Sequence, residues 1–202
     1  MIPPHKKSLF TDLALLGGFV GREDGQGGWQ SFVGRTKTGH RILDVGAGLG
    51  MSRDRLANGG ANHVELQDPA LQLTTVDIHN PIHEIQSDKY SLVTAFDVIE
   101  HVEEDWAWLS NALRVASYSV ILTTPNYRVS QARNPHHVRE YTPAQLYWMG
   151  SRLGTVLECR CGDPLGNDIS PSLSPQVFFA SSAPHLYIEM ARANDGLVYP
   201  AG

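Results

Sequence analysis

Cysteine is scarce in this sequence, whose 202 residues contain only Cys159 and Cys161. Two thiols cannot supply the four ligands of a structural zinc site. Two positions apart on a strand, they point the same way and cannot form an unstrained disulfide. We therefore expect two reduced thiols in a cytosolic protein.

Long apolar runs, internal repeats and an excess of positive charge are also missing. No apolar run approaches the roughly 20 residues of a membrane-spanning helix. Asp12 interrupts the apolar part of a segment that faintly imitates a signal peptide, so Ser8 to Val20 is expected to be a short amphipathic helix. With a formal net charge of −5, the chain has no global field that attracts nucleic acid. We expect a cytoplasmic protein that makes no membrane contact, in which any nucleic-acid binding must rest on a local basic patch.

The composition that remains is that of a globular protein, with 42% hydrophobic and 18% charged residues. The length suits one domain with its own hydrophobic core. Residues 1–39 form an N-terminal helical or lid segment in this interpretation, and residues 40–202 form the domain. The glycine-rich stretch 21–28 is expected to be a mobile segment that leads into a packed helix.

From His40 onward, short apolar runs alternate with polar or helical segments, which predicts a parallel sheet covered by helices. The expected strands are Arg41–Val45, His63–Gln67, Leu73–Val76, Ser91–Phe96, Ser119–Thr123, Val156–Arg160 and Leu186–Met190. Only eight residues separate Asp68 from Asp77, too few for the helical crossover that joins parallel neighbours. The short connection therefore conflicts with the second expected strand and with Asp68 at its end.

Two helices are well marked. Trp106, Leu109 and Leu113 recur at helical spacing between residues 103 and 116, behind an acidic first turn. A second helix begins after Thr142, with proline at its first position, Gln145 placed for a capping box and a glycine stop at residue 154.

A glycine-rich loop follows the first expected strand in R-I-L-D-V-G-A-G-L-G, residues 41–50. Glycines here permit close backbone approach to a ligand, or a turn that needs positive φ. A dinucleotide fingerprint from Gly46 requires a third glycine at residue 51, where the chain has Met51. This disfavours a nicotinamide-dependent oxidoreductase, and no lysine follows as in a phosphate-binding P-loop.

The loop resembles the D-x-G-x-G-x-G motif of class I S-adenosylmethionine (SAM) dependent methyltransferases. Three further segments match that family in order: D-I-H at 77–79, V-I-E-H-V at 98–102 and H-x-R-E-Y-T-P at 137–143. The usual K-P-G-G turn is replaced by A-S-Y-S at 116–119, which changes a surface turn only. The resemblance implies an α/β, Rossmann-like methyltransferase fold: a mostly parallel seven-stranded sheet with an antiparallel last strand and helices on both faces.

The resemblance also implies a cofactor site for SAM. Asp44 would act near the cofactor's ammonium group, Asp68 would accept hydrogen bonds from the two ribose hydroxyls, and Asp77 would meet the adenine amino group. Each aspartate could instead be a solvated residue at a strand end. The full set of cofactor contacts implied is Asp44, Gly46, Ala47, Gly48, Gly50, Asp68, Asp77, Ile78, His79, Phe96 and Asp97.

A sulfonium methyl is already activated, so the protein must chiefly hold a nucleophile in line with it and exclude water. A hydroxyl acceptor would benefit from a base, for which His101, His136 and His137 are candidates, with His101 and His137 preferred as catalytic residues. The expected activity is O-methylation of a small-molecule or sugar-like acceptor.

A metal is the open alternative. Asp97, Glu100 and His101 would share one face of a helix start, and His137 could approach from a later loop. This part resembles the metal-binding E-x-x-E-H of small-RNA 3′-terminal 2′-O-methyltransferases, with Asp97 replacing the first glutamate. In the preferred alternative, Glu100 and His101 cap or orient the helix and His137 hydrogen-bonds a neighbouring backbone group, so no metal is assigned.

The loop from 127 to 139 is locally basic through Arg128, Arg133, His136, His137 and Arg139, which favours an anionic acceptor or merely a solvated loop. Tyr127 and Tyr141 could stack on a flat acceptor or belong to the core. Metal-assisted RNA 2′-O-methylation and a catalytically silent SAM-binding or interaction module remain the alternative functions.

Overall fold

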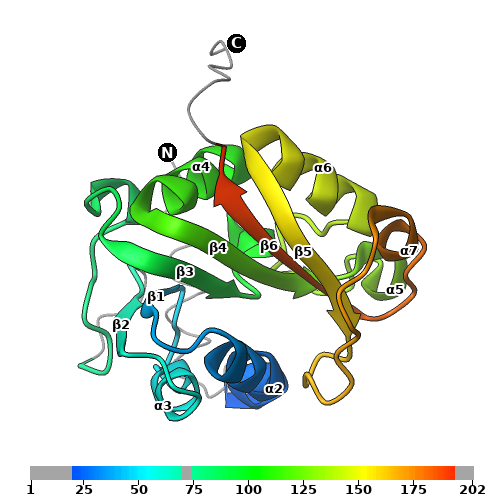
Figure 1. Cartoon of the computed structure of the whole chain (residues 1–202). Coiled ribbons are helices and arrows are strands. Elements are labelled where there is room, and N and C mark those ends of the chain that lie inside the picture. Colours follow the sequence, from blue (N-terminus) through cyan, green and yellow to red (C-terminus); the bar gives the residue numbers. More distant parts are fainter. Residues whose placement is uncertain (1–19, 70–73, 194–202) are drawn as a thin grey trace.

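The computed structural model describes residues 20–69 and 74–193, which form one mixed sheet between two layers of helices (Figure 1). The strands are β1 (Arg41–Val45), β2 (His63–Gln67), β3 (Tyr90–Phe96), β4 (Ala116–Pro125), β5 (Gly154–Gly162) and β6 (His185–Arg192). The helices are α2 (Val20–Thr36), α3 (Ser52–Asn58), α4 (Asp105–Val115), α5 (Tyr127–Ser130), α6 (Pro143–Leu153) and α7 (Pro175–Phe179), with short 3-10 turns at η1 (Ile82–Glu84) and η2 (Ile99–His101).

The sheet has the order β2-β1-β3-β4-β6-β5. β1 is parallel to β2 and β3, and β3 is parallel to β4. β6 runs antiparallel to both of its neighbours, β4 and β5. The expected mostly parallel sheet with an antiparallel last strand is therefore confirmed, and the carboxyl ends of the parallel strands meet at one edge, where ligands bind in open α/β sheets.

The strand expected over Leu73–Val76 is wrong. Residue 73 lies outside the described residues, and residues 74–76 form a turn and an irregular segment. The return from β2 is short: the amides of Asp77 and Ile78 donate to the Leu66 carbonyl at 3.0 Å, and Ile78 makes one isolated parallel bridge with Gln67. The sheet consequently has six strands in the described residues, because eight residues cannot form a crossover.

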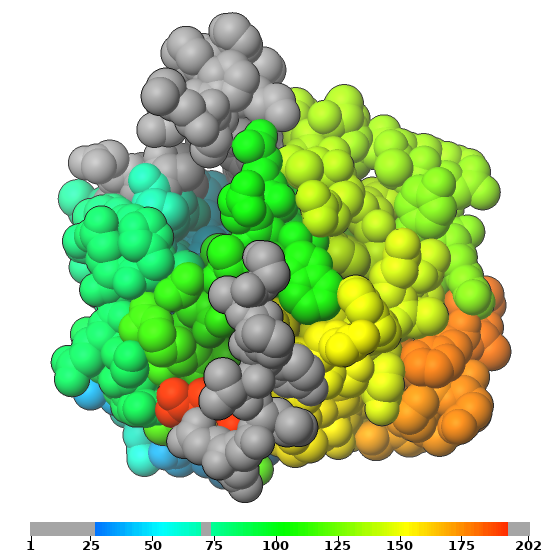
Figure 2. Space-filling view, turned by 90° about the horizontal axis from the view of Figure 1, so that it is seen from above, coloured from blue at the N-terminus to red at the C-terminus, as the bar shows by residue number. Residues whose placement is uncertain are grey.

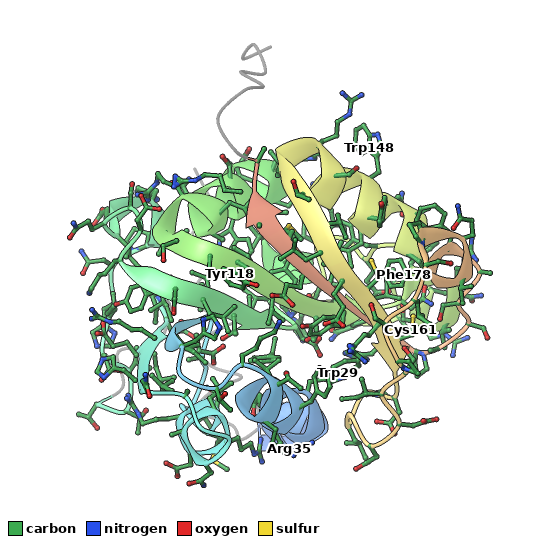
Figure 3. The ribbon with its side chains drawn as sticks, in the orientation of Figure 1. Trp29, Arg35, Tyr118, Trp148, Cys161 and Phe178 are labelled. Atoms are coloured by element: carbon green, nitrogen blue, oxygen red, sulfur yellow. The ribbon has the colours of Figure 1, made fainter. Side chains whose placement is uncertain are left out.

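Alternation along the strands divides the core between the two faces of the sheet. Ile42 packs with Trp29 and Leu56 beneath α2 and α3, whereas its neighbour Leu43 packs with Leu109 and other residues beneath α4 and α6. Figure 3 shows Trp29 between α2 and the sheet, where its ring stacks on Tyr187 at a centroid distance of 5.8 Å. Seen from above, α4 and α6 lie side by side over one face (Figure 2).

Both marked helices form close to where they were expected. α6 has the full capping box, in which Thr142 Oγ1 accepts from the Gln145 amide and the Gln145 side chain accepts from the Thr142 amide. The glycine-rich stretch 21–28, expected to precede the packed helix, lies inside α2. The expected amphipathic helix at residues 8–20 falls almost wholly outside the described residues.

The two cysteines lie on β5 as free, buried thiols. Burial raises the pKa of Cys159 to about 12, since an apolar environment disfavours the thiolate. In the ranges that the structure describes, no helix is long and apolar enough to cross a membrane.

Candidate functional site

The glycine loop follows β1 at the carboxyl edge of the sheet. Gly46, Gly48 and Gly50 have φ values of 68°, 55° and 88°, in the left-handed region that glycine adopts without cost. A Cβ on Gly46 would lie 2.6 Å from a methyl group of Val98. The amides of Gly46 and Ala47 both donate to the Gln67 carbonyl, at 2.8 and 3.1 Å, which joins the loop to the end of β2.

Two carboxylates flank this loop. Asp44 is 2% exposed at the loop's base and accepts a hydrogen bond from Thr94 Oγ1 at 2.6 Å. Asp68, at the end of β2, is also buried, and its Oδ2 accepts from the Gly48 amide at 3.1 Å. The missing strand therefore does not displace Asp68, which contacts the glycine loop itself.

The segment after β2 brings Asp77 to the same side, in a different role. Asp77 Oδ2 accepts from the Leu66 amide at 2.8 Å and from Arg53 Nη2 at 2.6 Å. This oxygen therefore holds the segment that follows β2 against β2 and α3. Ile78 is partly buried and His79 is exposed. The expected adenine contacts of these residues stay predictions, and Arg53 of α3 is a participant that the sequence did not single out.

The end of β3 carries the next two expected residues. The Phe96 side chain is buried beneath α2 and α3. Asp97 follows with a left-handed φ of 53°, and its two carboxylate oxygens lie 2.9 Å from His185 Nε2. Thr123 Oγ1 donates to the same carboxylate at 3.1 Å. This contact between β3 and the start of β6 was missed, because 88 residues separate the two side chains.

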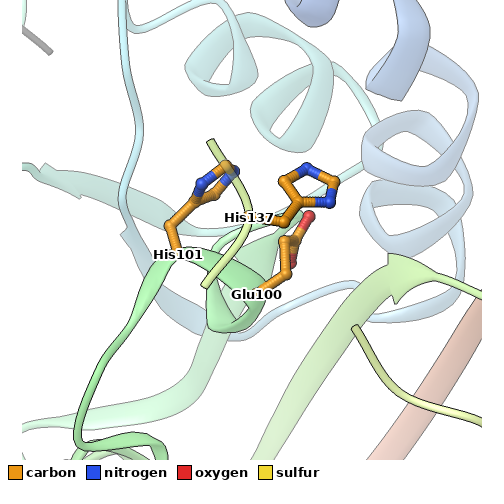
Figure 4. A group of neighbouring side chains, drawn as sticks. All are labelled: Glu100, His101 and His137. Carbon is orange, nitrogen blue, oxygen red and sulfur yellow. The ribbon is translucent and has the colours of Figure 1, made fainter. Parts of the chain in front are cut away.

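Glu100, His101 and His137 converge beside this edge (Figure 4). One potential ligand atom from each lies within 4.8 Å of the others. Glu100 is fully buried and accepts from Thr124 Oγ1 at 3.1 Å. Its carbonyl accepts from the Val138 amide at 2.8 Å, which brings the loop that carries His137 alongside η2. Asp97 was expected in this group and is not part of it, since its carboxylate is turned to His185.

The H-x-R-E-Y-T-P segment fixes the position of His137. Arg139 and Tyr141 both donate to Asp105 Oδ2 at 2.7 Å, which ties the segment to the start of α4. Glu140 accepts from His137 Nδ1, from Ser130 Oγ and from the Ala132 amide. Burial disfavours the charged form of Glu140, but these hydrogen bonds outweigh it and lower the pKa of its carboxyl group.

The expected basic loop lies at the rim of this cluster. Tyr127 is 45% exposed, whereas Tyr141 is buried, so only Tyr127 is accessible for stacking. Arg128 donates to the Phe179 carbonyl at 2.7 Å. Arg133 and His136 are exposed. Arg139 is engaged with Asp105, so Arg133 and His136 supply the accessible basic groups of the rim among those expected.

No protein-family model matches the chain, and no curated protein sequence matches it. Solved structures do resemble it. The 1,6-didemethyltoxoflavin-N1-methyltransferase of Burkholderia thailandensis, solved with S-adenosylhomocysteine (SAH), has a TM-score of 0.67 and 14% identity over 96% of this chain and 92% of its own. The magnesium protoporphyrin IX methyltransferase of Synechocystis PCC 6803, also with SAH, has a TM-score of 0.63 and 16% identity over 93% and 100%.

The small RNA methyltransferase HEN1 has a TM-score of 0.61 and 18% identity over 85% of this chain, which corresponds to 25% of HEN1. The three proteins are named for different acceptors, so the likeness does not select among them. What it establishes is the fold, since a fold hosts many activities. The chain has the Rossmann-like fold found in these SAM-dependent methyltransferases.

Proposed function

We propose that this chain is a SAM-dependent methyltransferase. The observation that carries the proposal is the closure of the glycine loop on Asp68: a positive-φ loop after β1 and a buried carboxylate after β2 meet through the Gly48 amide. This arrangement sits at the carboxyl edge of the sheet, where this class of fold binds its ligands.

The residues at this edge fit an adenosyl-linked amino acid. The Gly46 position has no room for a side chain because Val98 packs against it, and the three glycines of the loop place no side chain between its backbone and a ligand. One oxygen of Asp68 accepts from the Gly48 amide, and a carboxylate is the group that accepts the two hydrogen bonds of a vicinal diol. Asp44, buried beneath the loop, would counter an ammonium group. SAM would supply an electrophilic methyl group when bound.

The chain's own part in methyl transfer would be to orient the acceptor and take its proton. His101 and His137 lie at the cluster beside the carboxyl edge, with ring centroids 4.8 Å apart. Either imidazole could accept the proton of an acceptor hydroxyl. The exposed Tyr127, Arg133 and His136 suit a small, flat or anionic acceptor with a hydroxyl group.

Isothermal titration with SAM, SAH and NAD tests the cofactor assignment. We expect SAM and SAH to bind and NAD to give no heat. Failure of both SAM and SAH to bind would contradict the proposal, and binding of NAD alone would favour an oxidoreductase. SAM turnover against pools of hydroxyl acceptors then separates an enzyme from a silent SAM-binding module.

Metal-assisted 2′-O-methylation of RNA is a second candidate, favoured by one specific observation. Glu100, His101 and His137 offer a carboxylate and two imidazoles within 4.8 Å, a donor set suited to a divalent transition-metal ion. An ion held there would polarise a ribose hydroxyl. The acidic net charge disfavours extended RNA binding, which limits this candidate to a short terminal segment at the basic rim.

The two candidates differ in their response to chelation. Turnover of a short 3′-terminal RNA that is abolished by EDTA and restored by Mn²⁺ would support the second candidate. Turnover of a small-molecule acceptor that survives EDTA would support the first. His101→Ala should abolish Mn²⁺ binding under the second candidate while leaving SAM affinity unchanged.

A further inference from the structure

The protonation pattern of the two histidines at the cluster can be derived from their neighbours. His101 Nδ1 lies 3.0 Å from the His136 carbonyl, which only accepts, so Nδ1 carries the proton and Nε2 the lone pair. The partner is a backbone atom. The tautomer of His101 is therefore set by the path of the main chain around His136.

His137 is fixed by two side chains. Glu140 is a carboxylate, so its contact with Nδ1 requires Nδ1 to be the donor. On the other side, Asn134 Nδ2 lies 2.9 Å from Nε2. Because Asn134 Oδ1 is held by the His136 amide at 3.0 Å, the amide nitrogen is the atom that faces the ring, and it must donate to Nε2. Both neighbours require the same Nδ1–H tautomer.

Glu140 is buried, and both of its carboxylate oxygens are held by hydrogen bonds. Its side chain is 1% exposed and that of His137 is 5% exposed. The second oxygen of Glu140 accepts from the Ala132 amide at 2.9 Å and from the Ser130 hydroxyl. The backbone N–H of Ala132 can only donate, so this end of the side chain must remain an acceptor.

We propose that Glu140 is a positioning residue that holds His137 as its Nδ1–H tautomer and thereby keeps the lone pair on Nε2, the atom that Asn134 Nδ2 contacts in this structure. The inference deepens the proposed function, on which its consequence for turnover rests. A histidine that binds a metal or accepts a proton through one nitrogen commonly donates its other N–H to a carboxylate or carbonyl. Both imidazoles of the cluster have such a partner before any ligand is bound.

Glu140→Gln is the sharpest test, because glutamine cannot accept at both ends. The Ala132 amide requires the glutamine oxygen, which leaves the glutamine NH₂ facing His137. That NH₂ would donate to Nδ1 and shift the proton to Nε2, and the new Nε2–H would displace the Asn134 NH₂ from the ring. Long-range ¹H–¹⁵N correlation spectra of the imidazoles, assigned with His101→Gln and His137→Gln, should show Nδ1–H for His137 in the wild type and Nε2–H in Glu140→Gln.

Calorimetry with Mn²⁺ and with Zn²⁺ gives a second readout. Loss of such an outer partner commonly weakens metal binding about 10- to 100-fold, and we expect a loss of this size in Glu140→Gln. Glu84→Gln is the matched control: Glu84 is half-exposed and its carboxylate contacts Asn80, so the same charge is removed away from the cluster. Neither the spectra nor the affinities should change in that control.

Two further measurements keep the inference open to refutation if Glu140→Gln folds poorly. Wild-type protein with Nε2–H at His137 would overturn it without any variant. Ser130→Ala removes one donor to Glu140 and leaves the carboxylate, so it should keep the Nδ1–H tautomer; loss of that tautomer would assign the effect to loop packing and reject Glu140. If the wild type binds neither metal, the metal-assisted function fails, while the tautomer comparison still decides the role of Glu140.

Discussion

Asp68 joins the end of β2 to the glycine loop, and its contribution to SAM affinity can be measured with a single substitution. In Asp68→Asn the amide oxygen can keep the Gly48 contact, but the charge that would bind a diol is lost. Hydrogen bonds to charged groups contribute about 1.5–3 kcal/mol, so the Kd for SAM should rise roughly 10-fold to 100-fold. Titration calorimetry measures this, with Asp168→Asn, at an exposed position, as the control. Unchanged SAM affinity would exclude Asp68 from the cofactor site.

Glu65 gives the fold a defined dependence on pH. Burial opposes its charge, but hydrogen bonds from Tyr90, Arg41, His63 and Lys89 outweigh burial and lower the pKa of Glu65 to about 2. A depressed folded-state pKa stabilises the protein above the unfolded pKa of about 4.5, and that stability is lost as pH falls from about 4.5 to about 2.

Glu65→Gln should therefore matter at neutral pH and little in acid. The stabilisation lost at pH 7 is at most about 3 kcal/mol, which corresponds to a fall in Tm of at most roughly 6–12 °C. Thermal unfolding of wild type and variant from pH 7 to pH 2.5 should give a Tm difference that shrinks steadily below about pH 4.5 and is small at pH 2.5. A constant difference across that range would mean that Glu65 contributes by packing and not by its charge.

At the scale of elements, the N-terminus of α6 is set by the Thr142–Gln145 capping box. Thr142→Ala removes the acceptor for the Gln145 amide, and such a loss typically costs about 1 kcal/mol. Urea unfolding should show a lower midpoint with an unchanged slope. Thr36→Ala is the control: its hydroxyl donates to the Phe32 carbonyl at the end of α2, where no cap is lost. Equal effects of both substitutions would contradict a capping role.

The elements that the sequence predicted correctly are those encoded locally. The apolar runs of β1 and β2 give the observed bounds, and the cap and stop of α6 stand where Thr142 and Gly154 predict them. The strand at 73–76 failed because a short apolar run was assigned as a strand although its connection to β2 is too short for a crossover. The helix α2 was not predicted over residues 21–28, because glycines such as Gly27 and Gly28 have low helix propensity. Packing of Trp29 and Val33 on the sheet outweighs that low propensity.

The sequence could predict those parts of the candidate site that lie within single motifs or at neighbouring strand ends. The glycine loop and Asp68 are in contact, because the strand ends of a parallel sheet share one edge. The pairing of Asp97 with His185 was not predictable, because a histidine at the start of a strand carries no periodic signal of its distant partner. Glu140 stood inside a recognised segment, but its role depends on Ser130 and Ala132, which a motif does not specify.

At the scale of the whole molecule, the glycine-loop site and the layer of α4 and α6 depend on different parts of the core. The glycine loop depends on β1, β2 and β3, whereas α4 and α6 bury the opposite core with Leu109, Leu146 and Met149. A ligand that binds only the folded state raises global stability whatever the origin of a distant defect. Changes far apart in the structure should therefore add in free energy.

Stabilisation by SAH should distinguish a variant in the glycine-loop site from a variant in the helical layer of α4 and α6. At 100 times its Kd, a ligand contributes about 2.7 kcal/mol, or roughly 5–10 °C in Tm for a chain of this size. Thr142→Ala should start from a lower Tm and show the same increment. At an SAH concentration of 100 times the wild-type Kd, Asp68→Asn should keep most of its starting Tm and lose between about half and most of the increment. Differential scanning fluorimetry across an SAH series measures both quantities. If Thr142→Ala lost the increment, or Asp68→Asn kept all of it, the ligand would be bound away from the glycine loop, because only a site built on that loop separates the two variants in this way.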